Sequence, residues 1–413
     1  MSTKKAYPTK YYIRFLTFLV FAVFTFFFRV KKKLPNEVKK LKPPFIILSN
    51  HVGFWDPFIV GHYLPHFTHF VSSDAVFKSR FLSFFLTRLG TIPKKKNVRD
   101  TKVIRDILAV INQGENVGLF PEAVRNWAGS SFVIDPSIIK LLKLLKVPVV
   151  IATLKGMNLF NPRWAKTLRP TQVEVEYKLL FEKNDISTLS ENEMFEQLSK
   201  AIEFDEVKHQ KKKMNKIYSQ NRSEYINHAL YACPECKNID SFRTNKNNFT
   251  CSKCSYEIHI NKYGFFERTI EGELHFDNIR DWYNWQEKWL LDLVKNKLNR
   301  KYSDVVFQDA NSKIYHSKPE KSLKYIGSAN VKLFIDRIEL AFDNKESIIF
   351  NFNDLQTINP QVNERVEIFY NNEMYRLVGG RNGVSGLKWE VALNAIWKNM
   401  GQHYKLSPYI LQK

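Results

Sequence analysis

Hydrophobic and polar positions follow two alternating patterns between residues 40 and 205, and together these patterns predict an α/β layer fold. Short continuous apolar runs are typical of buried strands, whereas apolar residues repeating every three or four positions are typical of helices. The predicted strands cover residues 45–49, 68–72, 117–120, 147–154 and 171–181. The predicted helices run from Asp100 to Gly114, from Asp135 to Leu145, and onward from the capping box Ser190-x-x-Glu193.

An apolar run without charge precedes this pattern at residues 15–28, and seven of its fourteen residues are phenylalanine. A helix of that length covers about 21 Å, less than the ~30 Å hydrocarbon core of a bilayer. Basic residues 29–33 follow it in place of a small-residue cleavage site, which argues against a signal peptide. We therefore expect residues 1–42 to associate with membranes, as one short span or as a helix in one leaflet, with a buried core helix as the alternative.

The pattern changes again after residue 205. One domain is predicted at 43–205, and a polar, basic linker is predicted at 206–230. A cysteine-containing module follows at 231–265 and a helical connector at 266–300, with Trp282, Trp285 and Trp289 on one helix face. Short strands and one closing helix predict a β-rich domain at 301–413, and this order of elements resembles that of a pleckstrin-homology-like domain.

Charge limits the classes of partner. The 413 residues carry 63 Lys and Arg against 41 Asp and Glu, a net charge of +22. Eleven basic residues and one acid fall within residues 1–42. Such an excess indicates a negatively charged partner: anionic lipid, a phosphorylated substrate or nucleic acid. The basic residues lie beside the phenylalanine-rich run and are denser on its C-terminal side, which favours lipid and predicts that the rest of the chain lies on the cytoplasmic side.

The four cysteines of the chain form two close pairs. Cys233 and Cys236 are separated from Cys251 and Cys254 by fourteen residues, and no cysteine occurs elsewhere. Two such pairs supply four thiolates for tetrahedral zinc, as in a zinc ribbon. Four protein ligands leave no coordination position for water, so we predict a structural zinc. His228 and His259 lie nearby in the sequence but are not predicted to be ligands.

Asn50-His51-Val52-Gly53-Phe54-Trp55-Asp56 follows directly on the first predicted strand. A histidine can take a proton from a hydroxyl at neutral pH, and a carboxylate on its other nitrogen fixes the tautomer. The spacing alone is weak evidence, since His69 and Asp74 share it within an apolar segment, where a structural histidine is expected. His51 lies at the end of a strand, where functional loops concentrate.

Four ordered blocks resemble the glycerolipid acyltransferases, the lysophosphatidic acid acyltransferase-like proteins. Asn50-His51-x4-Asp56 is similar to their first block, and residues 90–96, 118–125 and 147–150 are similar to the second, third and fourth. The resemblance covers roughly residues 40–205 and implies that His51 is the general base and Asp56 its orienting carboxylate. It also implies that Lys96, Glu122 and Arg125 bind the phosphate end of the acceptor.

The chain departs from these blocks at two positions. The third block usually has glycine where this chain has Ala123, and the second usually ends in arginine where this chain has Lys96. An added methyl group narrows the approach of the backbone to a phosphate, and lysine lacks the bidentate fork of arginine. Both differences concern the identity of the acceptor more than the acyl chemistry.

Three functions follow from these observations, in order of preference. The first is a membrane-associated O-acyltransferase that moves a fatty acyl group from acyl-CoA or acyl carrier protein to a lysophospholipid such as 1-acylglycerol-3-phosphate. Its expected partners are membrane phospholipid and lysophospholipid, with acyl carrier protein as a further candidate and no nucleic acid. The alternatives are a catalytically inactive lipid-binding adaptor and a zinc-ribbon nucleic-acid-binding protein.

Overall fold

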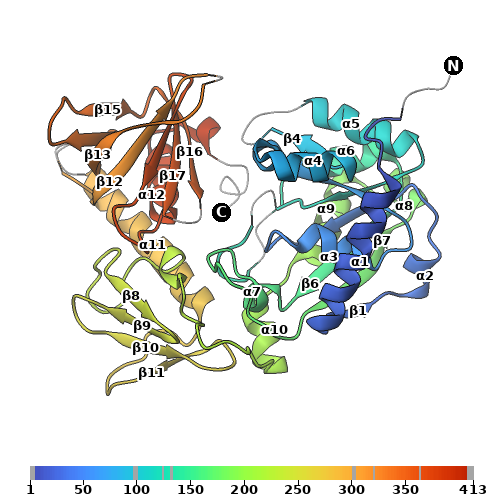
Figure 1. Cartoon of the computed structure of the whole chain (residues 1–413), viewed down its shortest axis with the longest axis horizontal. Coiled ribbons are helices and arrows are strands. Elements are labelled where there is room, and N and C mark those ends of the chain that lie inside the picture. Colours follow the sequence, from blue (N-terminus) through green and yellow to red (C-terminus); the bar gives the residue numbers. More distant parts are fainter. Residues whose placement is uncertain are drawn as a thin grey trace. The chain divides into compact units, whose positions relative to one another are not determined.

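The computed structural model describes residues 5–95, 101–122, 125–130, 134–299, 304–319, 321–361 and 364–406 (Figure 1). The chain divides into two compact units, which are described separately. Unit 1 comprises Met1–Pro162 and Pro170–Ile217, and unit 2 comprises Arg163–Arg169 and Tyr218–Leu411.

Unit 1 is built on a mixed sheet. The described strands are β1 (Lys31–Lys33), β2 (Ile46–Ser49), β3 (Thr68–Ser73), β4 (Ile92–Lys94), β5 (Asn116–Leu119), β6 (Val149–Lys155) and β7 (Glu174–Phe181), in the spatial order β1-β7-β6-β2-β5-β3-β4. Neighbouring strands are parallel except for β6 and β7. The carboxyl ends of β2, β5 and β6 therefore meet at one edge of the sheet, where parallel α/β folds carry their sites.

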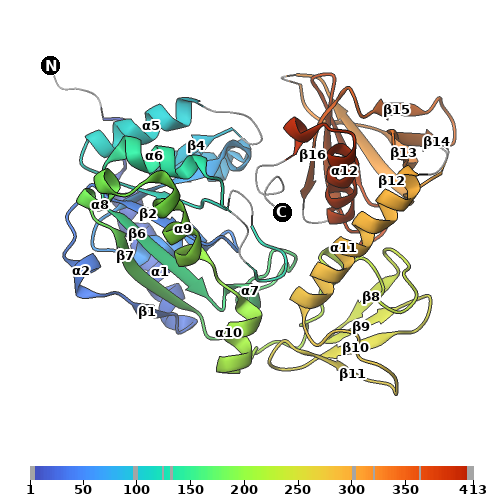
Figure 2. The same ribbon diagram turned by 180° about the vertical axis from the view of Figure 1, so that it is seen from behind.

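Helices cover both faces of this sheet. One layer contains α5 (Thr101–Asn112), α6 (Ser137–Leu145), α8 (Lys183–Thr188) and α9 (Glu191–Ile202), and Figure 2 shows it in front. The other side carries α1 (Tyr11–Phe27), α2 (Asn36–Lys39) and α3 (Asp56–His62), seen in Figure 1. The remaining helices are α4 (Arg80–Arg88), α7 (Met157–Phe160) and α10 (Glu206–Lys213). The predicted α/β layer fold is confirmed, including the capping box in which Ser190 and Glu193 bond each other's backbone N–H groups.

The core of unit 1 lies between the sheet and the α5, α6 and α9 layer. Alternate strand residues face it, and they pack against the apolar stripes of the helices because strand side chains alternate between the two faces. Its strand residues include Ile46, Leu48, Val117, Leu119, Val149 and Ile151. Burial of this face fixes the register of the central strands, and with it the position of the loops at their carboxyl ends.

The N-terminal segment is part of unit 1. Helix α1 packs against α3, with the Phe21 and Phe58 rings stacked at 4.9 Å, and β1 continues the sheet beside β7. Helix α1 is 17 residues long, about 26 Å at 1.5 Å per residue. Within the described residues, no helix has the length and apolar character needed to cross a membrane.

Unit 2 begins with a small antiparallel sheet and a long helix. The strands β8 (Phe242–Asn245), β9 (Asn248–Cys251), β10 (Glu257–Ile260) and β11 (Phe266–Arg268) lie in the order β11-β10-β9-β8. Helix α11 (Ile279–Leu298) follows and inserts Trp282, which is fully buried, among the rings of Phe242, Phe249 and Phe266. Trp285 and Trp289 stack on the same helix.

The rest of unit 2 confirms the predicted β-rich C-terminal region. An antiparallel sheet in the order β15-β14-β13-β12-β18-β17-β16 is followed by α12 (Leu387–Asn399). Its described strands are β12 (Phe307–Ser317), β13 (Lys324–Leu333), β14 (Arg337–Phe342), β15 (Ile348–Asn351), β16 (Leu355–Gln361), β17 (Arg365–Tyr370) and β18 (Glu373–Val378). The sequence pattern missed β12 and β16, because polar residues interrupt their apolar alternation.

A buried lysine joins the two parts of unit 2. Lys388 on α12 forms ion pairs with Asp240, within the cysteine module, and with Asp309 on β12, the latter at 2.7 Å. Asp309 also accepts a hydrogen bond from Trp389 Nε1 at 2.8 Å. Burial alone lowers the pKa of the Lys388 ammonium, but the two carboxylates outweigh that effect and raise it. The cysteine module and the β-rich sheet are therefore joined by ion pairs centred on a fully buried lysine.

Candidate functional site

The site is centred on the loop between β2 and α3. His51 follows β2 by two residues, and Asp56 is the first residue of α3. His51 Nδ1 lies 2.8 Å from Asp56 Oδ2. Because an offset of five is not a same-face helix spacing, this contact requires the loop to fold back on itself. The imidazole remains 21% exposed, whereas the carboxylate is fully buried.

The same carboxylate oxygen also holds the backbone of the loop in place. Asp56 Oδ2 accepts hydrogen bonds from the backbone N–H of Val52 at 2.6 Å and of Gly53 at 2.8 Å. Asp56 Oδ1 is also buried, and no described group donates a hydrogen bond to it. Asn50 holds the start of the loop to β6, since its side chain exchanges two hydrogen bonds with the backbone of Leu154.

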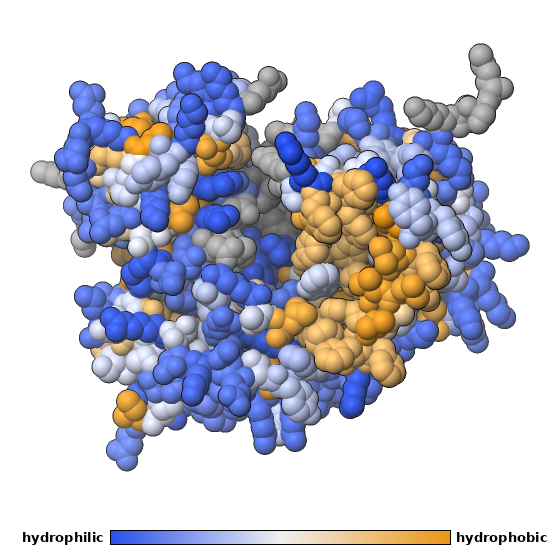
Figure 3. Space-filling model, in the orientation of Figure 1, coloured by the Kyte–Doolittle hydropathy of each residue, from blue (hydrophilic) through white to orange (hydrophobic). Residues whose placement is uncertain are grey.

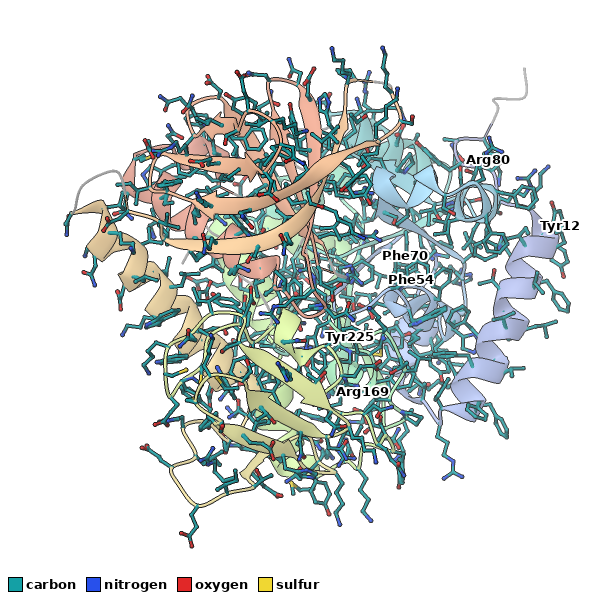
Figure 4. All side chains as sticks on the ribbon, turned by 60° about the vertical axis from the view of Figure 1, so that its left-hand side comes forward. Tyr12, Phe54, Phe70, Arg80, Arg169 and Tyr225 are labelled. Atoms are coloured by element: carbon teal, nitrogen blue, oxygen red, sulfur yellow. The ribbon has the colours of Figure 1, made fainter. Side chains whose placement is uncertain are left out.

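Apolar rings flank the imidazole. The His51 ring stacks on Phe120, with centroids 4.4 Å apart, and Phe120 in turn lies 5.9 Å from Phe70 of β3. Phe70 covers Gly118, where a Cβ atom would lie 2.3 Å from the phenylalanine ring. Gly118 is therefore required for this ring to pack over β5. Figure 4 labels Phe70 together with Phe54, which precedes α3. The sequence pattern gave no separate signal for Phe120 beyond its place in the third block.

The third block leaves the carboxyl end of β5, next to β2. Glu122 is 1% exposed, and Arg125 is half-buried. Burial lowers the pKa of the Arg125 guanidinium, while the negative charge of Asp56 acts in the opposite direction. Arg125 is thus close enough to interact electrostatically with Asp56. Lys96 and Ala123 lie outside the described residues.

His69 has a different environment from His51. Its ring is fully buried, Nδ1 lies 2.8 Å from the carbonyl oxygen of Gly90, and Nε2 is hydrogen-bonded to Glu115. Both ring nitrogens are therefore engaged, and Asp74 is not their partner. This is the structural histidine that the apolar pattern predicts.

An exposed apolar surface covers the outer side of α1 and extends to α4. Figure 3 shows it as a continuous orange area, and Tyr12 points away from the body of unit 1 (Figure 4). On α1 its exposed members are Tyr11, Tyr12, Phe15, Leu16, Phe18, Leu19, Val20, Val23, Phe26 and Phe27. On α4, Phe81 is 78% exposed and Phe84 53%. The apolar composition of residues 81–86 fits either a core helix or a second membrane-contacting surface, and the core interpretation is wrong for these two residues.

Helices α1 and α4 are in direct contact. The backbone N–H of Lys10, at the start of α1, donates to the carbonyl oxygen of Arg88 at 2.9 Å. Basic side chains border the apolar surface: the guanidinium of Arg88 lies over the Phe84 ring, and Lys32 lies over Tyr63. The two helices therefore present one apolar surface with a basic border.

The four cysteines of unit 2 form one cluster. The Sγ atoms of Cys233 and Cys254 are 3.7 Å apart, as are those of Cys236 and Cys251, and all four lie within 4.8 Å of one another. A tetrahedral shell with Zn–S bonds of about 2.3 Å separates sulfurs by about 3.8 Å. The donor set and its spacing thus suit zinc.

The two cysteine pairs adopt the same turn. In each, the residue after the second cysteine has a positive φ, 61° at both Lys237 and Ser255, and its N–H donates to the carbonyl of the first cysteine. The histidines near the cluster have other partners: His228 contacts Glu364, and His259 contacts Asn248.

Comparison with known proteins supports the resemblance of unit 1. Residues 27–155 match the family model described as Acyltransferase, which confirms the predicted resemblance. A stretch of 113 residues is 23% identical to a 1-acyl-sn-glycerol-3-phosphate acyltransferase of Bacillus subtilis, covering 27% of this chain and 56% of that relative. The chain therefore spans little more than half the length of the curated relative it matches. A crystal structure of the 1-acyl-sn-glycerophosphate (LPA) acyltransferase from Thermotoga maritima is 16% identical, with a TM-score of 0.39, over 46% of this chain and 84% of that one.

Proposed function

We propose, from the premise that residues 27–155 form an acyltransferase-family domain, that this chain transfers a fatty acyl group to the hydroxyl of a lysophospholipid. The acceptor class is 1-acylglycerol-3-phosphate or a close relative, as in the name of the Bacillus subtilis relative. The donor is an acyl thioester, carried on coenzyme A or on acyl carrier protein.

The observation that carries this proposal is the contact between His51 and Asp56. With Nδ1–H donated to a carboxylate, Nε2 keeps its lone pair and serves as the base. It removes the proton from the acceptor hydroxyl while that oxygen attacks the thioester carbonyl. The C–S bond then breaks, and the imidazolium returns the proton to the departing thiolate.

Binding of the acceptor is assigned to the second and third blocks. Arg125 supplies a fixed positive charge near Asp56, and guanidinium groups suit the planar, bidentate recognition of phosphate. Lys96 adds a point charge, and Glu122 accepts hydrogen bonds at the polar end of the acceptor. These roles follow from the match to the family's blocks.

The apolar surface of α1 and α4 is the proposed contact with the membrane. Because α1 also packs against α3, we propose that it lies in one leaflet with its exposed side in the acyl region, and that unit 1 faces the cytoplasm. Basic side chains at the border then attract anionic headgroups. This arrangement brings the base close to a substrate that resides in the bilayer.

Zinc is the proposed occupant of the four-cysteine cluster. Cys233, Cys236, Cys251 and Cys254 would hold it, and its role would be structural because the four thiolates complete the shell. The module has little core of its own apart from the rings around Trp282, so metal binding would contribute directly to its folding.

The experiment is an acyl-transfer assay on the full chain. Acyl-CoA or acyl carrier protein thioester is incubated with lysophosphatidic acid in vesicles, and phosphatidic acid is quantified. We expect the native chain to form the diacyl product and His51→Ala to lose it. His66→Ala, an exposed histidine of the same unit, is the matched control and keeps full activity. Equal rates for the native and His51→Ala chains would contradict the mechanism, and no product from either would favour a lipid-binding adaptor.

A further inference from the structure

We propose that Asn126, Asn158 and Glu206 are positioning residues that hold the backbone of His51 in place against Asp56. Buried hydrogen bonds connect α10 to the loop carrying the base: the Glu206 carboxyl accepts from the backbone of Asn158, and the Asn158 side chain donates to that of Asn126. The proposal rests on the proposed function for its kinetic part only, because the geometry of the loop can be measured without any substrate.

Asn126 makes the direct contact with the base. Its backbone N–H donates to the carbonyl oxygen of His51 at 3.1 Å, and its side-chain Nδ2 donates to the same oxygen at 3.3 Å. The residue is 3% exposed. Two donors on one carbonyl fix the orientation of the peptide that follows His51, and the next two N–H groups, those of Val52 and Gly53, are the ones that bind Asp56.

Asn158 holds the side chain of Asn126 from the other direction. Asn126 Oδ1 accepts hydrogen bonds from Asn158 Nδ2 at 3.0 Å and from the backbone N–H of Gly129 at 3.1 Å. With Oδ1 occupied in this way, the amide of Asn126 has one orientation, and Nδ2 necessarily points to His51. Asn158 itself is 5% exposed and lies on α7, directly after β6.

Glu206 fixes both segments that carry these asparagines. Its carboxylate accepts the backbone N–H of Gly156 at 2.9 Å and that of Asn158 at 3.3 Å. Its own N–H donates to the carbonyl oxygen of Gly129 at 2.8 Å. An isolated bridge between Ser130 and Asp205 adds to this contact. Glu206 thus ties the start of α7 to the loop that contains Asn126.

The packing is tight at two glycines beside these contacts. Gly129 has φ +84°, and a Cβ atom there would lie 2.8 Å from the Cβ of Glu206 and 3.3 Å from Asn158 Oδ1. At the other end of α7, a Cβ on Gly53 would lie 3.2 Å from Asn161 Oδ1 and 3.4 Å from Asp56 Oδ1. Helix α7 is therefore enclosed between Glu206 and the catalytic loop, so a shift at Glu206 reaches His51.

The test compares Asn126→Ala with Asn116→Ala in the full chain. Asn116 is the matched control: it is fully buried, and its side chain likewise bonds backbone groups, those of Phe45 and Phe67, but it lies at the opposite end of β5. Asn126→Asp serves as a second variant that keeps the shape and the acceptor atom but replaces the donor to His51 with a carboxylate oxygen, which repels the His51 carbonyl. Glu206→Gln tests the far end of the chain of contacts.

Two readouts are needed. Amide hydrogen exchange at Val52 and Gly53 reports directly on the loop, and kcat and KM for acyl transfer report on catalysis. We expect Asn126→Ala and Asn126→Asp to accelerate exchange at both amides and to lower kcat about 10- to 100-fold with KM little changed, because a small displacement of a base is costly for the reaction. Glu206→Gln should shift both readouts in the same direction by less. Asn116→Ala should leave both readouts at native values.

The outcomes separate this inference from the proposed function. Exchange at Val52 and Gly53 that is no faster in Asn126→Ala and Asn126→Asp than in Asn116→Ala overturns the inference, whatever the activity. Faster exchange in a chain whose native form transfers no acyl group supports the positioning role and contradicts the proposed function. Faster exchange with unchanged kcat also overturns the inference, because the loop would then be supported without consequence for the base.

Discussion

His51 and Asp56 are joined through a single oxygen that also receives two backbone N–H groups. Asp56 Oδ2 lies 2.8 Å from His51 Nδ1 and binds the N–H groups of Val52 and Gly53 as well. The carboxylate therefore determines the fold of the loop and the orientation of the ring at once. A substitution that preserves the first role and removes the second is the most informative one.

Asp56→Asn is that substitution. Its carbonyl oxygen can still accept the two backbone N–H groups, so we expect the chain to fold, but the negative charge that stabilises the imidazolium is lost. The rate of acyl transfer should fall by about 10²- to 10⁴-fold, as expected for a disabled general base. Initial rates at saturating acceptor provide the measurement.

The control for this substitution is Asp74→Asn. Asp74 has the same spacing from His69 that Asp56 has from His51, but it is exposed, and His69 is bonded to Gly90 and Glu115 instead. It should retain native activity. Comparable losses of activity in the two variants would mean that the effect of Asp56→Asn does not come from its contact with His51. That result would contradict the proposed role of Asp56.

Glu206 gives unit 1 a pH-dependent stability. Burial raises the pKa of its carboxyl to about 7, although the N–H groups of Gly156 and Asn158 oppose the change. The unfolded carboxyl ionises near 4.5, so between pH 4.5 and 7 the folded chain holds a proton that the unfolded chain has released. The free energy of unfolding should therefore fall as pH rises through this window, by about 3 kcal/mol.

Urea unfolding of the native chain and Glu206→Gln from pH 4.5 to 8 tests this dependence. The Gln variant lacks the titrating group, so its stability relative to the native chain should increase with pH across the window. Glu203 is exposed and lies in the segment between α9 and α10. The free energy of unfolding of Glu203→Gln should therefore have the same pH dependence as that of the native chain. Parallel curves for the native chain and Glu206→Gln would show that the carboxyl titrates normally.

The cysteine cluster predicts one zinc per chain. Cys254→Ser removes one of four ligands, so we expect elemental analysis of the purified protein to show loss of the metal and thermal unfolding to begin at a lower temperature. Lys253→Ser introduces the same residue one position earlier, at an exposed site, and should keep both the metal and the stability. Absence of metal from the freshly purified native chain would refute the assignment.

Lys388 provides a test of the connection within unit 2. Lys388→Ala would leave Asp240 and Asp309 buried without their counter-charge, and removal of one member of a buried ion pair costs about 3 to 5 kcal/mol. Denaturant unfolding monitored by tryptophan fluorescence would measure the loss. Lys398→Ala, at the exposed end of the same helix, should change stability little. A similar small change for Lys388→Ala would mean that the network adds nothing to the stability of unit 2.

The parts of this architecture that could be predicted from sequence are those encoded by local patterns. The strand before His51, the capping box at Ser190 and the paired cysteines each have a short signature, and the structure contains each of them. Polar contacts between distant segments have no such signature. Asn126, Asn158 and Glu206 are isolated polar residues in the sequence, and only the fold brings them together.

The exposure of individual side chains could not be predicted from the sequence either. The apolar run 81–86 has the composition of a core helix, yet only Leu86 of the run is buried. Apolar composition shows that a surface avoids water, but it does not tell whether protein or lipid covers that surface. Lys388 illustrates the reverse case, because a lysine in a closing helix gives no sign that two distant carboxylates will enclose it.

The exposed phenylalanines of α1 and α4 lead to the last prediction. If both helices enter the same leaflet, Phe26→Ser and Phe81→Ser should each weaken binding to anionic vesicles by about tenfold or more, since burying one phenylalanine contributes about 1.5 to 3 kcal/mol. Phe26 is 86% exposed and Phe81 78%, so neither change disturbs the core. Vesicle sedimentation with phosphatidylglycerol mixed into phosphatidylcholine measures the partition.

The control for lipid binding is Ile349→Ser, which removes an exposed apolar side chain from β15 in unit 2. Its partition should match that of the native chain. If Phe26→Ser weakens binding and Phe81→Ser does not, α1 alone enters the lipid and the surface of α4 faces something else. Raising the salt concentration separates the two components of binding, because it screens the attraction of Lys32 and Arg88 to headgroups and leaves the apolar contribution in place. A partition that salt abolishes entirely would contradict insertion of either helix.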